Sequence, residues 1–149
     1  MTTEAEREVY RALRESQNRY TYFVLAAAGA GIALAVRETS SAGFEWPQIP
    51  LAVAAIVWGL SFFCGCRNSA LVSSTLYANL ELLRVLDGQH PEVGPNQNLI
   101  APASEGIRRA IEANSESANR VGHWQFRLLV LGAALYLAWH LLEMYLRTN

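Results

Sequence analysis

A chain of 149 residues is long enough for one domain, and 52% of its residues are hydrophobic while 17% are charged. In soluble domains about a quarter of the residues are charged. Here the charged residues are fewer and leave three apolar blocks between them, so the sequence indicates an integral membrane protein. The net charge of −1 excludes the basic surface that non-specific nucleic-acid binding requires.

The two cysteines predict neither a metal site nor a disulfide. Cys64 and Cys66 are separated by one residue, whereas structural zinc sites use a C-x-x-C spacing. Residues two apart point to different sides of a helix. We therefore expect small residues at a helix contact here, and no metal or cofactor.

Residues 3–19 predict an amphipathic helix, which Thr3 and Glu6 would open as a capping box. Such a helix would pack on the cytosolic helices or lie on the lipid surface. Glu is as frequent as Arg on its polar side, which favours packing. The apolar side comprises Ala5, Val9, Ala12, Leu13 and Tyr20, and the polar side Glu4, Arg7, Glu8, Arg11, Arg14 and Glu15.

Residues 20–36 predict the first membrane span, which is short but adequate. Ala27, Gly31 and Ala35 recur every four residues, a spacing that lets another helix approach closely. Residues 37–48 predict a short polar loop. Pro50 then suits the first turn of the next helix, where a missing N–H costs nothing.

Residues 49–66 predict the second span, and nothing after them stops the helix before residue 86. Residues 87–103 predict a loop that is rich in Gly and Pro. His90 lies there with Asp87 and Glu92, but this loop would supply two metal ligands at best, which favours a plain turn.

Pro102 to Leu146 predicts a third long helix, charged in its first half and apolar over residues 126–146, the third span. Residues 67–125 would then form a cytosolic antiparallel hairpin. Its apolar contact residues are predicted to be Leu76, Leu80, Leu83, Ile107 and Ile111. Asn79 and Asn114 are candidates for polar contacts that fix the register.

One face of the third helix becomes polar where the helix enters lipid. Ionisable residues in a span usually face protein or water, so this stripe is the candidate site, facing a bundle interior or a pore. The alternative is an interfacial belt of Tyr136, Trp139, Tyr145 and Arg147 that anchors the helix end. The candidate residues for the interior or pore lining are Gln125, Tyr136, His140 and Glu143.

The arginines predict the orientation. Residues 1–19 contain four and residues 67–127 contain six, against Arg37 and Arg147 elsewhere. The positive-inside rule therefore places the N-terminus and the hairpin in the cytoplasm, and the C-terminus outside.

Some residues carry a family resemblance: Gln17-Asn18-Arg19-Tyr20 before the first span, Arg67 after the second, and Leu76-Tyr77-Ala78-Asn79 through Leu83. Over residues 1–87 the chain resembles the SLATT domain, a family of small bacterial membrane effectors in nucleotide-activated conflict systems. The resemblance implies an inner-membrane defence or stress effector that forms pores, and it implies no functional residue. The third span departs from the two-span pattern of that family.

No P-loop, GxSxG or HExxH motif is present, so we expect a non-enzymatic protein. Three spans are too few to enclose an aqueous path, whereas several copies around an axis would suffice. We expect a homo-oligomer in the bilayer that conducts ions or permeates the membrane, with no nucleic acid. The alternative is a membrane-anchored scaffold whose hairpin captures a cytosolic protein partner.

Overall fold

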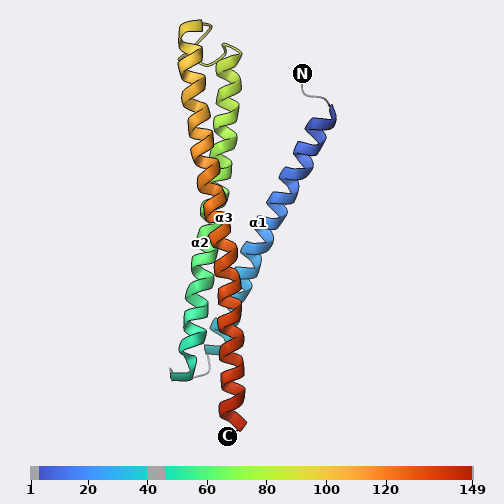
Figure 1. The fold of residues 1–149 in the computed structure, drawn as a ribbon, viewed down its shortest axis with the longest axis vertical. Coiled ribbons are helices and arrows are strands. Elements are labelled where there is room, and N and C mark those ends of the chain that lie inside the picture. The colour runs from blue at the N-terminus through green and yellow to red at the C-terminus, as the bar shows by residue number, and fades with distance from the viewer. Residues whose placement is uncertain (1–3, 40–45, 149) are drawn as a thin grey trace. The chain divides into compact units, whose positions relative to one another are not determined.

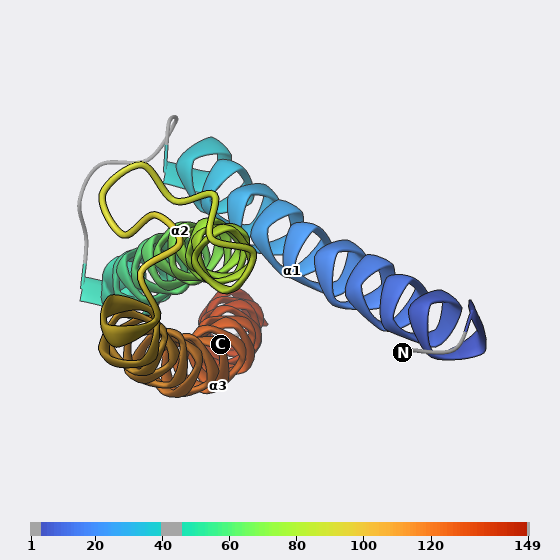
Figure 2. The same ribbon diagram turned by 90° about the horizontal axis from the view of Figure 1, so that it is seen from above.

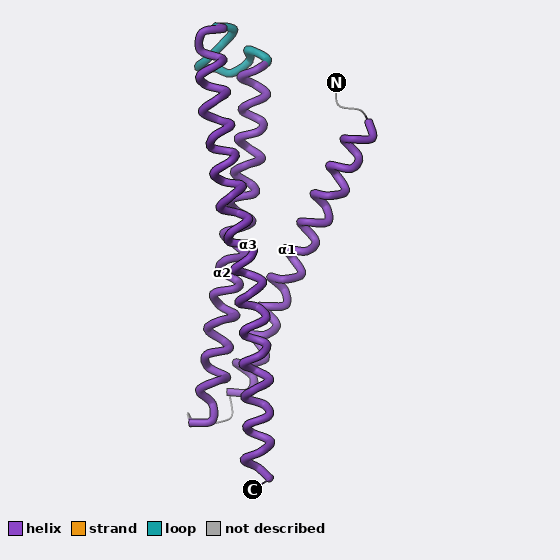
Figure 3. Tube along the Cα trace, viewed as in Figure 1, coloured by secondary structure: helices purple, strands orange, loops and turns teal. Residues whose placement is uncertain are grey.

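The computed structural model describes residues 4–39 and 46–148, without the side chains of residues 5–7, 9, 10, 13 and 14. This part of the chain is helical and contains no strand. The long helices are α1 (Glu4–Thr39), α2 (Ile49–Leu86) and α3 (Gln97–Thr148), and the 3-10 helix η1 (Trp46–Gln48) precedes α2 (Figure 1, Figure 3). All three long helices are apolar and long enough to cross a membrane, which confirms the all-α class and the three candidate spans.

Helix α1 joins the predicted amphipathic helix and the first span in a single element. Every side chain that the structure describes between residues 4 and 20 is exposed, and Tyr20 exposes 53% of its surface. Thr3 of the predicted capping box lies outside the described residues. The side chains of Ala5, Val9 and Leu13 on the predicted apolar side are also outside them.

The connection between α2 and α3 is shorter than predicted, because α3 begins at Gln97 rather than Pro102. Asn96 caps the helix: its Oδ1 accepts a hydrogen bond from the Asn98 N–H at 3.1 Å, as an N-cap side chain does. Pro102 is then accommodated inside the helix. The prediction that this helix starts at Pro102 is therefore wrong by five residues.

Helix α2 ends as the sequence predicts, at Leu86. Gly88 adopts a φ of 68°, which glycine tolerates best. The Gln89 N–H donates to the Arg84 carbonyl at 2.8 Å and the Gly88 N–H to the Val85 carbonyl at 3.1 Å, the pattern of a Schellman motif. Figure 2 shows the connection that leads from α2 into α3.

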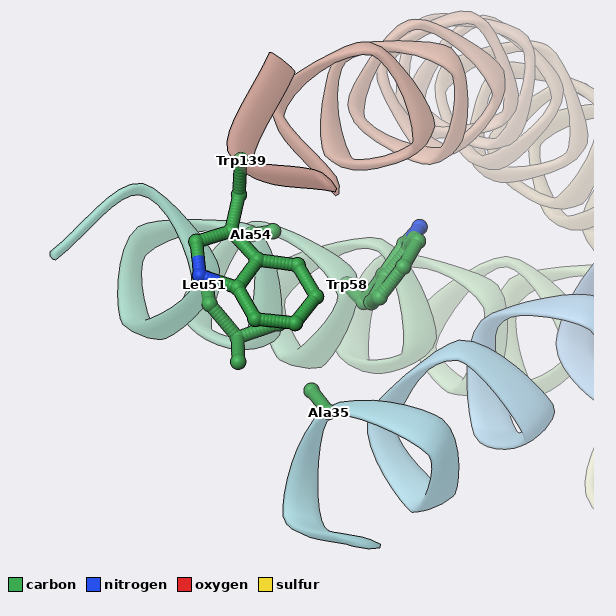
Figure 4. Packing of buried hydrophobic residues seen from close by; sticks show 5 residues of the cluster. All are labelled: Ala35, Leu51, Ala54, Trp58 and Trp139. Atoms are coloured by element: carbon green, nitrogen blue, oxygen red, sulfur yellow. The ribbon is translucent and has the colours of Figure 1, made fainter. Parts of the chain in front are cut away.

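The chain divides into two compact units, and both boundaries fall inside continuous helices. The first unit is Met1–Gly65 with Trp124–Asn149, and the second is Cys66–His123. In the first unit, segments of all three long helices contribute buried residues. Its core cluster combines Ala35 from α1, three residues from α2 and Trp139 from α3 (Figure 4); those from α2 are Leu51, Ala54 and Trp58.

The second unit is an antiparallel pair of helix segments. The Asn114 Nδ2 donates to the Ser74 hydroxyl oxygen at 3.3 Å, which links α3 to α2, whereas Asn79 bonds the Thr75 carbonyl of its own helix. The least exposed side of α2 in this unit consists of Leu71, Thr75, Ala78, Leu82 and Val85. The corresponding side of α3 consists of Ile107, Ile111, Asn114, Ala118 and Val121.

The predicted contact residues on α2 are corrected by this arrangement. Leu76, Leu80 and Leu83 are exposed by 41%, 45% and 59%, while Val85 is 1% exposed. Ile107 and Ile111 are half-buried. The face predicted to be buried is the one with the most leucine. The structure buries the face with Thr75 and Ala78, where small side chains reduce the distance between helices.

Candidate functional site

The candidate site lies in the first unit, where α3 turns one face toward its own chain. Its buried residues there are Gln125, Gly132 and Trp139, each seven residues from the next. Seven residues correspond to about two helical turns, so all three lie on one side. Helix α1 buries a comparable line of mostly small residues: Val24, Ala28, Gly31 and Ala35.

Trp58 of α2 fills the space between these two lines. A Cβ added to Gly31 would lie 2.6 Å from Cδ2 of Trp58, and one added to Gly132 would lie 2.6 Å from Cδ1 of the same ring. Glycine is therefore required on both sides of the indole. Of the predicted α1 seam, Gly31 and Ala35 are buried and Ala27 is half-buried.

Two hydrogen bonds join α2 to the backbone of α3 in this unit. The Trp58 indole N–H donates to the Leu129 carbonyl at 3.2 Å, and the Ser61 hydroxyl donates to the Gln125 carbonyl at 2.7 Å. Polar contacts of this kind between helices in a bilayer contribute about 0.6 kcal/mol each on average. They fix the register of α2 against α3.

The side chain of Gln125 is enclosed by its own chain. It is 3% exposed, and its Nε2 has no hydrogen-bond partner among the described residues. A Cβ on Gly65 would lie 2.5 Å from that nitrogen and 2.6 Å from Cδ2 of Leu25. The absence of a side chain at Gly65 thus creates the space that the Gln125 amide occupies.

Aromatic rings continue the candidate site along α3. The centroid of the Tyr136 ring lies 5.9 Å from that of Trp58 and 5.6 Å from that of Trp139. The Trp139 and His140 ring centroids are 6.2 Å apart. Trp139 is 5% exposed, and its Nε1 has no hydrogen-bond partner in the described part of the chain. Its indole reaches from α3 toward Leu51 and Ala54 of α2 (Figure 4).

The predicted polar stripe is therefore divided between two environments. Gln125 is buried and Tyr136 is half-buried against Trp58. His140 is exposed, and Glu143 is half-buried in an ion pair with Arg147. The structure brings Gln125 and Tyr136 to the interior of the first unit and leaves His140 on an outer face.

Trp58 and Ser61, whose side chains donate to the α3 backbone in the first unit, are not among the residues predicted from the sequence. The sequence contains a signal, because the second span has a tryptophan near its middle and each of the other two spans contains glycine, at positions 29 and 31 in the first and at 132 in the third. Recognising it requires the register between helices, which depends on packing rather than on the spacing within each helix.

The loop histidine is placed by α2 and by its own turn. His90 Nε2 lies 3.5 Å from an Oε atom of Glu81, and the Glu92 N–H donates to His90 Nδ1 at 3.2 Å. No group of three His, Cys, Asp or Glu side chains that could hold a metal ion occurs within residues 4–39 and 46–148. Cys64 is half-buried and Cys66 exposed, and both are free thiols.

Comparisons with protein-family models, curated proteins and solved structures find no match to this chain. The resemblance to the SLATT domain stays an expectation from the residues that carry it.

Proposed function

We propose that several copies of this chain assemble in a bacterial inner membrane and together let ions or small solutes cross it. The observation that carries the proposal is His140, which is exposed on an otherwise apolar segment of α3. The exposed neighbours Leu137, Leu141 and Met144 suit lipid, whereas an ionisable side chain in a span usually faces protein or water. A surface made by neighbouring copies would supply that environment.

The path would lie between copies rather than through one chain. Trp58 and Trp139 fill the centre of the first unit, and both are 5% exposed. Gln125 is enclosed by Gly65 and Leu25, so it does not line a path in a single chain. This favours His140, with Glu143 one turn further along, as the polar groups that copies would present to a shared lumen.

A second candidate function is a membrane-anchored scaffold. The observation in its favour is the exposed leucine-rich face of α2 in the second unit, since contiguous apolar patches usually mark interaction sites. A scaffold would need this face for a cytosolic partner, and it would need no polar lumen at His140.

Leakage from reconstituted vesicles tests the proposal. We expect the purified protein to release a small dye, and His140→Ala to change the rate of release several-fold. Leu141→Ala, an adjacent exposed position, is the matched control.

Vesicles that stay tight with an assembled oligomer present would contradict the pore and leave the scaffold. Equal leakage from wild type and His140→Ala would contradict a lining role for His140 and favour the interfacial belt as the role of this segment.

A further inference from the structure

The second unit exposes an aliphatic strip on α2 that its own chain does not cover. The strip, here called the leucine strip, follows steps of three and four residues, so its members share one face. Together these side chains expose on the order of 300 Å², the size at which an apolar patch usually has a function. Its members are Val72 (38% exposed), Leu76 (41%), Leu80 (45%) and Leu83 (59%).

Helix α3 carries a complementary strip of small residues in the same unit. This small-residue strip comprises Gly106, Ala110, Ala113 and Ser117, again at steps of three and four. The first three are exposed, and a Cβ on Gly106 would meet nothing within 4 Å. Rows of small side chains form a shallow groove, into which larger side chains of another helix can insert.

Both strips lie at the same level of the antiparallel pair. The hydrogen bond between Ser74 and Asn114 sets the register, and each step along α2 matches one step back along α3. Counting from that bond, Val72 is level with Ser117, Leu76 with Ala113 and Leu83 with Gly106, each to within one residue. The leucine strip and the small-residue strip thus have equal length and lie at equal height.

We infer that the leucine strip of one copy packs into the small-residue strip of the next copy. This inference rests on the oligomer of the proposed function and names the contact that builds it. The two strips are different surfaces, so their contact is head-to-tail. Because they lie at the same level along the helix pair, each copy is rotated relative to the previous one without a shift along the helix axis. Such an interface closes into a ring instead of extending into a filament.

The area of the contact fits copies that share a membrane. A stable complex in water buries about 800 Å² on each partner, more than twice what the leucine strip exposes. Isolated hairpins would therefore not associate strongly through this contact. In a ring every copy makes the contact twice, and membrane anchoring raises the local concentration of neighbouring hairpins, so a modest area suffices.

Cysteine cross-linking between differently tagged copies tests the contact. Cys64→Ser and Cys66→Ser provide the background. One tagged copy then carries Leu76→Cys, and the other carries Ala113→Cys. On oxidation of membranes that contain both, we expect a disulfide dimer bearing both tags. A single chain with both substitutions should give a ladder of multimers that stops at the size of the ring.

Ser115→Cys is the matched control for Ala113→Cys. Ser115 is also exposed, and two residues along a helix it points away from the small-residue strip. It should give at least tenfold less of the mixed dimer with Leu76→Cys. Unchanged helicity by circular dichroism shows that each variant has folded.

Other outcomes would overturn the inference. Strong dimers of Leu76→Cys alone, with no ladder from the double variant, would mean that leucine strips pair with one another about a two-fold axis. No cross-link of either kind, in an assembly whose mass in detergent equals several copies, would refute this contact and leave the oligomer standing. A mass of one copy would refute the oligomer of the proposed function as well.

Discussion

At the scale of single residues, the packing of the first unit depends on the absence of a side chain at two glycines. Trp58 lies between Gly31 and Gly132. A methyl group added to either glycine would collide with the Trp58 indole. A methyl group on one side would push the ring toward the other, where the second glycine's helix blocks it. The hydrogen bond from Trp58 to the Leu129 carbonyl also opposes rotation of the ring.

Substitution of these glycines should therefore destabilise the first unit. We expect Gly31→Ala and Gly132→Ala each to cost about 1–3 kcal/mol, the usual range for overpacking a tight core. Gly29→Ala is the control, because a Cβ there meets nothing within 4 Å. Alanine favours helix by up to about 1 kcal/mol over glycine, so the control should be neutral or stabilising. Thermal unfolding in detergent measures the difference, and equal melting of Gly31→Ala and Gly29→Ala would contradict the wedged position of Trp58.

At the scale of helices, the stability of the second unit depends on which face of α2 packs against α3. The structure buries Val85 and exposes Tyr77 by 72%, although both are apolar residues of the same helix. A charge placed at the buried position would lose its hydration and gain no partner.

We therefore predict that Val85→Asp lowers the stability of the second unit by roughly 3 kcal/mol or more. Tyr77→Asp, on an exposed face outside the leucine strip, should change it by less than about 0.5 kcal/mol. Hydrogen exchange of the amides in residues 66–123, followed by mass spectrometry, reports this unit directly. Equal protection in the two variants would mean that Val85 does not lie in the contact between α2 and α3.

The sequence predicts the existence of these helices better than their contacts. Apolar blocks and the Gly88 stop signal locate α2 to within one residue, because length and turn chemistry are local properties. Helix α3 begins five residues before Pro102, with Asn96 as its N-cap. The leucine-rich face of α2 is predicted to be buried because that prediction uses hydrophobicity alone. In the structure Thr75 and Ala78 face inward, a choice that depends on how closely two helices can approach.

The candidate site shows the same limit. A polar face along a span predicts that something other than lipid covers it, and Gln125 is buried. The sequence does not distinguish burial within the chain from burial between copies. That distinction separates Gln125, whose amide lies against Gly65 of α2, from His140, which is exposed.

At the scale of the whole molecule, the charges predict how the chain crosses the membrane. In the part of the chain that the structure describes, three helices are long and apolar enough to span it. Ten of the twelve basic residues lie in residues 1–19 and 67–127, and the other two are Arg37 and Arg147. Because arginine-rich segments stay on the cytoplasmic side of a membrane, this distribution predicts three crossings, with the connection between α2 and α3 inside and the end of α3 outside.

Thiol labelling in intact cells tests this topology. In a Cys64→Ser and Cys66→Ser background, Thr148→Cys should react with an impermeant thiol reagent, and Glu92→Cys should not. Both positions are exposed, so the difference reports the side of the membrane rather than burial. Glu92 is preferable to Gly94 in the same loop, because the φ of 56° at Gly94 would be strained by a side chain. Both variants should label fully once the membrane is permeabilised, which controls for reactivity. Labelling of Glu92→Cys alone in intact cells would invert the orientation, and labelling of both or neither would remove the third crossing.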